Sequence, residues 1–137
     1  MEEQIKRPGV GVAVIIEKRG RVFLGKRKKM NSHGVGTWCF PGGHIELWEE
    51  LEDTCKREVM EEANMKIKNI RFAGITNDFF KKEGKHYITI FFKADYVSGT
   101  PRPNAELNPI GWFPWNKLPR PLFLCMKNYL KKLYKIE

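Results

Sequence analysis

Three glutamates in one short segment, Glu58, Glu61 and Glu62, have the residue type and the spacing for metal-dependent chemistry. Positions i, i+3 and i+4 of a helix share one face, so their carboxylates would lie side by side. Like charges at this spacing repel and destabilise a helix. A hard divalent cation such as Mg²⁺ reverses that effect, because it prefers oxygen ligands and often reaches its substrate through phosphates. The alternative interpretation is a solvated acidic face.

The residues around these glutamates favour a site. Gly42 and Gly43 precede the acidic segment and would let the backbone pass close to the helix, where a glycine carbonyl could be a further oxygen ligand. Arg57 follows Glu49 by eight residues, so a bent loop would return Glu49 to pair with it, either to support a site or as an ordinary ion pair. Asn64 stands where the helix needs a left-handed stop, a conformation that Asn tolerates.

The charge is unevenly distributed along the chain. The 137 residues include 25 Lys and Arg and 16 Asp and Glu, for a formal charge of +9. Half of the acids lie between Glu46 and Glu62, where two basic residues offset eight acidic ones and leave −6. The rest of the chain therefore carries +15. A strongly basic field attracts anionic partners, although net charge alone does not define a function.

Composition limits the class of protein. The chain is 42% apolar and 12% aromatic, enough for a sizeable core, and its length suits a single domain over residues 1–137. No apolar run approaches the roughly 20 residues that span a bilayer, and the segment before Val10–Ile16 is not typical of a signal peptide. Cys39, Cys55 and Cys125 form no CxxC motif, which argues against a disulfide framework or a zinc site. We expect a cytoplasmic protein with no membrane partner.

The pattern of apolar residues predicts a sheet between helices. A helix is expected over Glu50–Ala63, with an apolar stripe along one face, and an amphipathic helix over Pro121–Tyr134, with Leu122, Met126, Tyr129, Leu130 and Leu133 inward. Strands are expected over Val10–Glu17, Arg21–Lys26, Thr37–Phe40, His44–Leu47, Ile67–Phe80, Lys85–Val97 and Gly111–Trp115. Strands, a helix, more strands and a final helix favour one mixed sheet covered by helices.

The segment Gly43–Met65 resembles the Nudix box, G-x5-E-x7-R-E-U-x-E-E-x-G-U, and keeps every charged position. Further similarity covers Arg7–Val12, Gly25–Lys28, Phe40–His44 and Trp112–Pro119. The chain is therefore similar to small MutT-like Nudix hydrolases. That resemblance implies an α/β fold of the α+β type, an α/β/α sandwich with a central mixed β-sheet. Two positions depart from the pattern: Asn64 replaces the closing Gly, and Trp48 stands where relatives usually carry Gly.

The resemblance also implies roles for the acidic residues. Glu58 and Glu62 would be the main Mg²⁺ ligands, assisted by Glu61 and by the Gly42 carbonyl, with Mn²⁺ as an alternative ion. Arg57 and Glu49 would orient the helix and its carboxylates. Glu106 matches the place where MutT-like enzymes add a carboxylate from a loop, although a solvated loop acid is an equal alternative. The spacing does not assign the general base.

Substrate contacts are predicted on both sides of the box. The basic run Lys26–Lys29, with Arg27 foremost, either meets the phosphate tail or forms a solvated turn. Base recognition is expected from Thr37, Trp38, Phe40, Asn77, Phe79 and the loop Leu118–Phe123. MutT-like enzymes that read 8-oxoguanine carry Asn or paired Asp in that late loop. This chain has neither there, so the preferred base stays open.

The leading hypothesis is Mg²⁺-dependent hydrolysis of a nucleoside triphosphate (NTP or dNTP) to the monophosphate and pyrophosphate, by a monomer or homodimer. A near alternative is hydrolysis of another nucleoside-diphosphate conjugate, such as an NDP-sugar or ADP-ribose. A basic nucleic-acid-binding module without catalysis is a third class. The third class is disfavoured because every carboxylate of the box is retained. The expected partner is therefore a small nucleotide.

Overall fold

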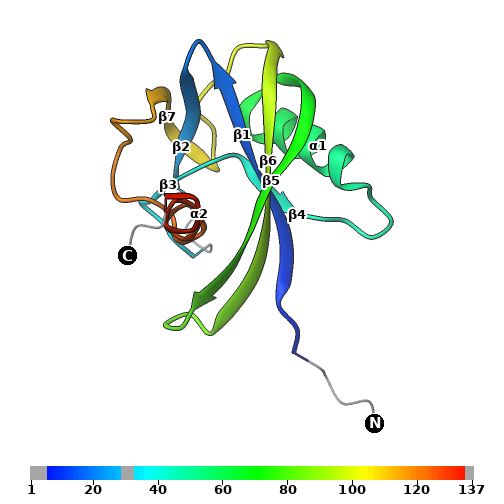
Figure 1. Cartoon of the computed structure of the whole chain (residues 1–137), viewed down its shortest axis with the longest axis vertical. Coiled ribbons are helices and arrows are strands. Elements are labelled where there is room, and N and C mark those ends of the chain that lie inside the picture. The colour runs from blue at the N-terminus through cyan, green and yellow to red at the C-terminus, as the bar shows by residue number, and fades with distance from the viewer. Residues whose placement is uncertain (1–5, 29–32, 135–137) are drawn as a thin grey trace.

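The computed structural model describes residues 6–28 and 33–134, and shows a mixed sheet with two helices in that part of the chain (Figure 1). The elements are β1 (Gly9–Lys18), β2 (Arg21–Arg27), β3 (Trp38–Cys39), β4 (Gly42–His44), α1 (Leu51–Ala63), β5 (Lys66–Phe80), β6 (Lys85–Ser98), β7 (Leu107–Pro114) and α2 (Leu124–Tyr134). The predicted α+β architecture with a mixed sheet is confirmed. Neither helix of this region has the length and apolar character needed to cross a membrane.

Strand β1 organises the sheet, whose strand order is β3-β2-β1-β6-β5. It runs parallel to β6, from the pair Gly9–Tyr87 to the pair Glu17–Asp95. On its other edge, β1 pairs with β2 only near their shared turn, and β4 takes over this edge opposite residues 11–13. This change of partner brings the glycines of β4 beside the sheet centre and next to α1.

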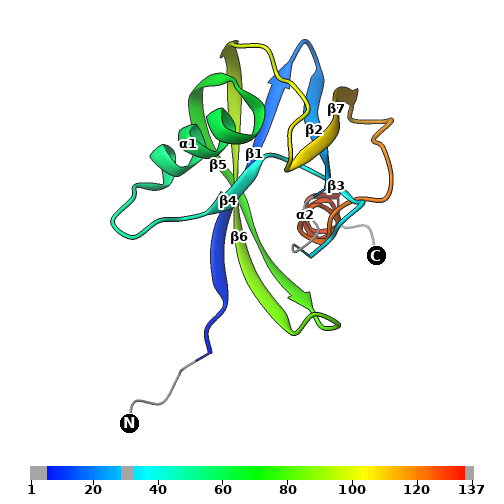
Figure 2. The same cartoon turned by 180° about the vertical axis from the view of Figure 1, so that it is seen from behind.

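Alternation along β1 divides the core between the two faces of the sheet. Val12, Val14 and Ile16 pack with Cys55 and Val59 of α1. The intervening residues of β1 face the other way and pack with α2, in a cluster that contains Ala13, Ile15, Phe91, Met126 and Tyr129. The two opposite views agree that α1 and α2 lie on different sides of β1 and β6 (Figures 1 and 2). The helices therefore cover opposite faces, as the sandwich prediction requires.

Helix α1 ends as its sequence predicts. Its last residue, Ala63, is buried, and Asn64 takes the left-handed conformation with φ 51° and ψ 44°. The Asn64 N–H donates to the Met60 carbonyl at 3.1 Å, and its side-chain amide donates to the Thr100 carbonyl. Asn64 therefore closes the helix where relatives of the Nudix type use Gly.

Four details differ from the expected elements. Strand β7 begins at Leu107 rather than Gly111, because Leu107 already pairs with Arg27 of β2. Helix α2 begins at Leu124 rather than Pro121, because the residues before Leu124 run alongside Trp38. The Trp38 N–H donates to the Pro121 carbonyl, and the Trp38 carbonyl accepts from the Phe123 N–H. Leu133 is exposed rather than packed inward. The predicted strand His44–Leu47 is also wrong. The strand there is β4, and the chain after His44 enters a turn closed by the Glu49 N–H and the Glu46 carbonyl.

Candidate active site

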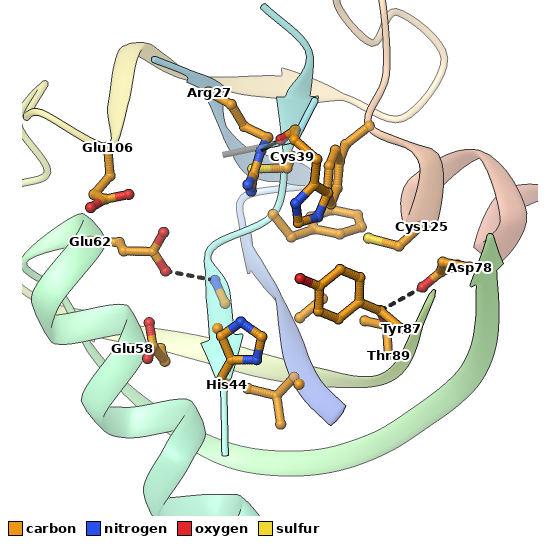
Figure 3. Close-up of a pocket in the computed structure, with 18 of the residues that line it drawn as sticks. Arg27, Cys39, His44, Glu58, Glu62, Asp78, Tyr87, Thr89, Glu106 and Cys125 are labelled. Atoms are coloured by element: carbon orange, nitrogen blue, oxygen red, sulfur yellow. Dashed lines mark hydrogen bonds between the residues drawn. The ribbon is translucent and has the colours of Figure 1, made fainter. Parts of the chain in front are cut away.

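A cavity of about 840 Å³ lies between α1, β4 and the strands β5 and β6 (Figure 3). Its acidic end is lined by Glu58, Glu61, Glu62 and Glu106. Its other end, which we call the base end, is lined by Asp78, Phe80, Tyr87, Thr89 and Phe123. Arg27 lies between the two groups in Figure 3. Residues far apart in the sequence thus meet in one space.

The loop before α1 is fixed by Arg57, whose guanidinium contacts four carboxylates. Its Nε and Nη2 donate to the two oxygens of Glu49, at 2.8 and 3.0 Å, so the predicted pairing is present. Nη2 also donates to the His44 carbonyl, and Nη1 contacts Glu58 at 2.7 Å. The hydrogen bonds from Arg57 lower the pKa of Glu49 to about 2. This arrangement locks β4, the turn and α1 together.

Glu58 and Glu62 are held against β4 by its backbone. The Gly42 N–H donates to Glu62 Oε2 at 2.9 Å. The Glu58 carboxylate packs on Gly43 so closely that a Cβ at Gly43 would stand 2.5 Å from it. Only glycine leaves that space. The pair of glycines therefore allows two carboxylates of α1 to lie directly on a strand.

The acidic end carries charges that burial opposes. Burial raises the pKa of Glu62 well above its usual value, and the neighbouring Glu58 charge raises it further. Burial also raises the pKa of Glu58, and the hydrogen bond from Arg57 offsets this only in part. Two adjacent, partly buried carboxylates favour a shared proton or a bound cation. The oxygen-only donor set fits a hard cation such as Mg²⁺.

The acidic end is not a closed metal cage. Within the described part of the chain, no three acidic, His or Cys side chains converge tightly enough to enclose an ion. Glu61 is 57% exposed and contacts Arg57 at 3.4 Å, so it points partly toward solvent. Such an open set suits Mg²⁺, which commonly keeps water and substrate phosphates among its ligands.

Glu106 reaches the acidic end from a loop that is tied to α1. The Asn104 side-chain amide donates to the Glu62 carbonyl at 2.7 Å, and Asn104 Oδ1 accepts the N–H groups of Glu106 and Leu107. The Lys28 N–H donates to the Glu106 carbonyl. Figure 3 shows the Glu106 carboxylate beside that of Glu62. The structure therefore brings Glu106 to the wall of the cavity on a tethered loop, where its side chain is still exposed.

The predicted substrate residues before the box are divided. Arg27 and Phe40 line the cavity. The Arg27 guanidinium lies 4.3 Å from the Phe123 ring centre, and its Nε donates to the His33 carbonyl. Thr37 instead donates to the Gly34 carbonyl, and Trp38 packs edge-on against Phe113, so neither lines the cavity. Lys29 of the basic run lies outside the described residues.

Asn77 and Phe79 do not line the cavity, so the structure does not bring these two predicted base contacts to it. Both side chains are exposed, with Phe79 54% exposed, and both contact His86. Side chains alternate along a strand, so Asp78 and Phe80 face the cavity instead. The prediction assumed the opposite face of β5 toward the cavity, and a shift of one residue exchanges Asn77 and Phe79 for Asp78 and Phe80.

The base end contains residues that the sequence reasoning missed. Tyr87 and Thr89 belong to β6, Cys125 to α2 and His33 to the loop before β3. Of the predicted loop Leu118–Phe123, only Phe123 lines the cavity. The sequence signal was partial: Thr76 and Asp78 in β5 and Thr89 in β6 are polar residues within strands that are otherwise rich in apolar ones.

Trp48 lies outside this cavity. Its side chain is 93% exposed, and its backbone φ of 71° falls in the left-handed region. It lines a second, shallower hollow with Val10, Ile45 and Leu47. The position where the box resemblance leads us to expect Gly is therefore left-handed in this chain, and Trp48 adopts that conformation without forming a wall of the main cavity.

The model of the NUDIX domain matches residues 5–133. The chain belongs to the NUDIX family. The resemblance expected from the box is thereby confirmed over nearly the whole chain. Among solved structures, the MutT NUDIX hydrolase from Burkholderia pseudomallei superposes with a TM-score of 0.85 at 28% identity, covering 93% of this chain and 99% of that one.

Curated relatives within the family are named for different activities. An oxidized purine nucleoside triphosphate hydrolase from Mus musculus is 31% identical over 106 residues, which cover 77% of this chain and 66% of that enzyme. An ADP-ribose pyrophosphatase from Methanocaldococcus jannaschii is 30% identical over 127 residues, covering 90% of this chain and 74% of the relative. This NUDIX chain thus spans just under two thirds of the mouse enzyme's length.

Proposed function

We propose that this protein is a Mg²⁺-dependent pyrophosphohydrolase that cleaves a nucleoside triphosphate, NTP or dNTP, to the monophosphate and pyrophosphate. The observation that carries the proposal is the single cavity that joins a cluster of glutamates to an aromatic end, with Arg27 between them. A triphosphate has the matching sequence of groups: a flat base, a sugar and a polyanionic tail. The membership of the NUDIX family supports the same reaction class.

Glu58 and Glu62 would hold the metal, with Glu61, Glu106 and the Gly42 carbonyl as further candidate ligands. When bound, Mg²⁺ or Mn²⁺ would neutralise phosphate charge and lower the pKa of an attacking water. Arg57 and Glu49 keep α1 against β4 and orient the Glu58 carboxylate. A carboxylate of the cluster accepts the proton of the attacking water. The oxygen of that water forms a new bond to phosphorus while a P–O–P bond breaks and pyrophosphate leaves.

Arg27 would bind the phosphate tail. Its guanidinium packs on Phe123 and donates one N–H to a backbone carbonyl, so it is held at the cavity wall. A fork of N–H donors suits phosphate oxygens. The charge of +15 outside the acidic segment would also draw a polyanionic nucleotide toward the cavity.

Since the three cysteines are buried and unpaired, we place this activity in a reducing compartment, the cytoplasm.

A second candidate substrate is another nucleoside-diphosphate conjugate, such as ADP-ribose or an NDP-sugar. The observation that favours it is the match to the archaeal ADP-ribose pyrophosphatase over 90% of this chain. A binding module for nucleic acid is a weaker candidate, because the acidic cluster lines the same cavity as the basic Arg27.

The test is a panel of NTPs, dNTPs, ADP-ribose and NDP-sugars, incubated with the protein and Mg²⁺, with pyrophosphate and phosphate measured separately. We expect Mg²⁺-dependent release of pyrophosphate from triphosphates, and its loss in Glu58→Gln. The matched control is Glu52→Gln, the same change at an exposed position of α1. No pyrophosphate from any triphosphate, or an equal loss in both variants, would contradict the proposal. Preferred cleavage of ADP-ribose or an NDP-sugar would support the second candidate.

A further inference from the structure

The base end of the cavity contains a buried carboxylate that the proposed chemistry does not use. Asp78 is fully buried, and its carboxylate accepts three hydrogen bonds. Oδ2 accepts from Thr89 Oγ1 at 2.7 Å and from Thr76 Oγ1 at 3.2 Å, and Oδ1 accepts from the Asn128 amide at 2.9 Å. Among the described residues, no Lys, Arg or His forms an ion pair with Asp78. All three donors to this carboxylate in the described part of the chain are neutral.

The bond to Asp78 decides what Thr89 can offer to a ligand. A threonine hydroxyl has one hydrogen to donate and two lone pairs that accept. Thr89 donates its hydrogen to Asp78 and also hydrogen-bonds the Cys125 thiol, which leaves one lone pair of its oxygen for a ligand. The same residue lines the cavity. Figure 3 shows this bond at the inner side of the cavity, beside Tyr87 and Cys125. Toward the cavity, the Thr89 oxygen is therefore an acceptor, and a ligand must bring the N–H or O–H group.

The walls around Thr89 suit a flat heterocycle. The rings of Phe80, Tyr87 and Phe123 pack together. Phe80 is tilted by 34° against Phe123, with centroids 5.5 Å apart, and meets Tyr87 edge-on, with centroids 5.9 Å apart. The His33 imidazole already stacks on Tyr87, with ring centres 4.9 Å apart and planes 13° apart. The His33 ring also contacts Phe80 and Phe123, so these walls already hold one planar nitrogen heterocycle. A nucleobase would stack here in place of His33, close to Thr89, which lies two residues beyond Tyr87 on β6.

We propose that Thr89, oriented by Asp78, accepts a hydrogen bond from an exocyclic amino group of the nucleobase. The base end then selects bases that carry such a group, guanine, adenine or cytosine, over bases with a carbonyl or hydrogen in its place. A carbonyl oxygen would face the remaining lone pair of Thr89 and leave both acceptors unpaired in a buried space. Thr89 is the specificity residue, and Asp78 is its positioning residue. The inference rests on the proposed function, since it takes the ligand to be a nucleotide.

The test measures binding of nucleoside monophosphates, without metal, to the full chain by calorimetry. GMP and IMP differ only in the 2-amino group, and CMP and UMP differ at the 4-position. In the pair that binds more tightly, we expect the wild-type protein to prefer the amino member by about tenfold or more, the usual size of one well-made hydrogen bond. Thr89→Val removes the acceptor at constant shape and should reduce the preference to about twofold. Thr89→Ser keeps the hydroxyl and should retain it.

Asp78→Ala tests the positioning step. Without Asp78, the Thr89 hydroxyl is free to turn and donate into the cavity, so IMP or UMP should gain affinity relative to the amino member. A merely structural role would weaken all four ligands alike. Asp95→Ala is the matched control, because Asp95 is an Asp of β6 that bonds Asn69 and Arg71 outside the cavity. Thermal melts check that each variant is folded. If Thr89→Val is unfolded, the test uses Asp78→Ala and Thr89→Ser instead.

Equal affinity for both members of each pair, no binding of any of the four, or an unchanged preference in Thr89→Val would overturn the inference. These results are independent of hydrolysis. A protein that releases no pyrophosphate but shows the Thr89-dependent preference would refute the proposed reaction and keep this inference. A protein that hydrolyses triphosphates without any amino preference would do the reverse.

Discussion

Adding one methyl group at Gly43 should disable the acidic end without removing any carboxylate. A Cβ at this position would lie 2.5 Å from the Glu58 carboxylate, whereas ordinary contact begins at 3.4 Å. The carboxylate must therefore retreat by about 1 Å. Its 2.7 Å bond to Arg57 cannot follow without disturbing the pair of bonds that Arg57 makes to Glu49. The displacement is thus imposed on the proposed metal ligand.

The expected loss follows from that displacement. A misplacement of about 1 Å at a reacting group costs up to about 100-fold in rate. We expect Gly43→Ala to lower kcat/KM for Mg²⁺-dependent pyrophosphate release by about 10- to 100-fold, or about 1.4–2.7 kcal/mol of transition-state stabilisation. The backbone of Gly43 is not in the left-handed region, so no additional strain is expected from φ.

The control for this variant is Gly111→Ala in β7. A Cβ there would stand 3.1 Å from the Phe113 ring, a side chain that gives way by a few tenths of an ångström. Activity should stay near the wild-type level in that variant. Steady-state kinetics with the preferred triphosphate, together with thermal melts, compare the two. If folded Gly43→Ala keeps the wild-type kcat/KM, Glu58 does not act from the position seen here.

Three further predictions concern Glu49, Glu62 and Trp48. The pKa of Glu49 is lowered to about 2, so the stabilising effect of its charge is present above pH 4.5 and lost as the pH falls toward 2. Between pH 4.5 and 2, Glu49→Gln should therefore lose less thermal stability than wild type, and identical pH profiles of the two proteins would contradict this. The pKa of Glu62 is raised, so the contribution of this residue to folding stability falls as the pH rises. Without metal, Glu62→Gln should therefore melt at a higher temperature than wild type at about pH 8, whereas Mg²⁺ should raise the melting temperature of wild type only. Trp48 occupies a left-handed conformation, so Trp48→Gly should stabilise the fold by about 1 kcal/mol in denaturant unfolding, and a loss of stability would show that its side chain makes compensating contacts.

The elements could be predicted well where local pattern and burial agree. In α1 the buried residues Cys55, Val59 and Ala63 recur at helical spacing, and Asn64 marks the end, so the sequence places this helix within one residue. In the region of Pro121, pattern and structure disagree. The apolar residues there are buried, but tertiary pairing with Trp38 keeps the backbone extended before the helix begins.

The acidic end was predictable because most of it is local. Glu49, Arg57, Glu58 and Glu62 fall within 14 residues. Helical geometry brings the last three together, and the short turn before α1 returns Glu49 to Arg57. The base end was not predictable in the same way. It combines β5, β6 and α2, and its residues depend on which face of β5 is inward, a choice that a sequence rich in apolar residues on both faces does not fix.

This division between a local acidic end and an assembled base end bears on substrate choice within the family. The mouse triphosphate hydrolase and the archaeal ADP-ribose pyrophosphatase are equally distant from this chain, at 31% and 30% identity, so overall similarity does not select between their substrates. Under the proposed function, the acidic end would supply the same chemistry, cleavage of a phosphoanhydride, whichever nucleotide is bound. Selectivity must therefore arise outside α1. In this chain the groups in position to provide it are the Thr89 acceptor, the Asp78 carboxylate that orients it and the aromatic walls. A substitution at Thr89 should change which nucleotide is bound, whereas one at Glu58 should change only whether it is cleaved.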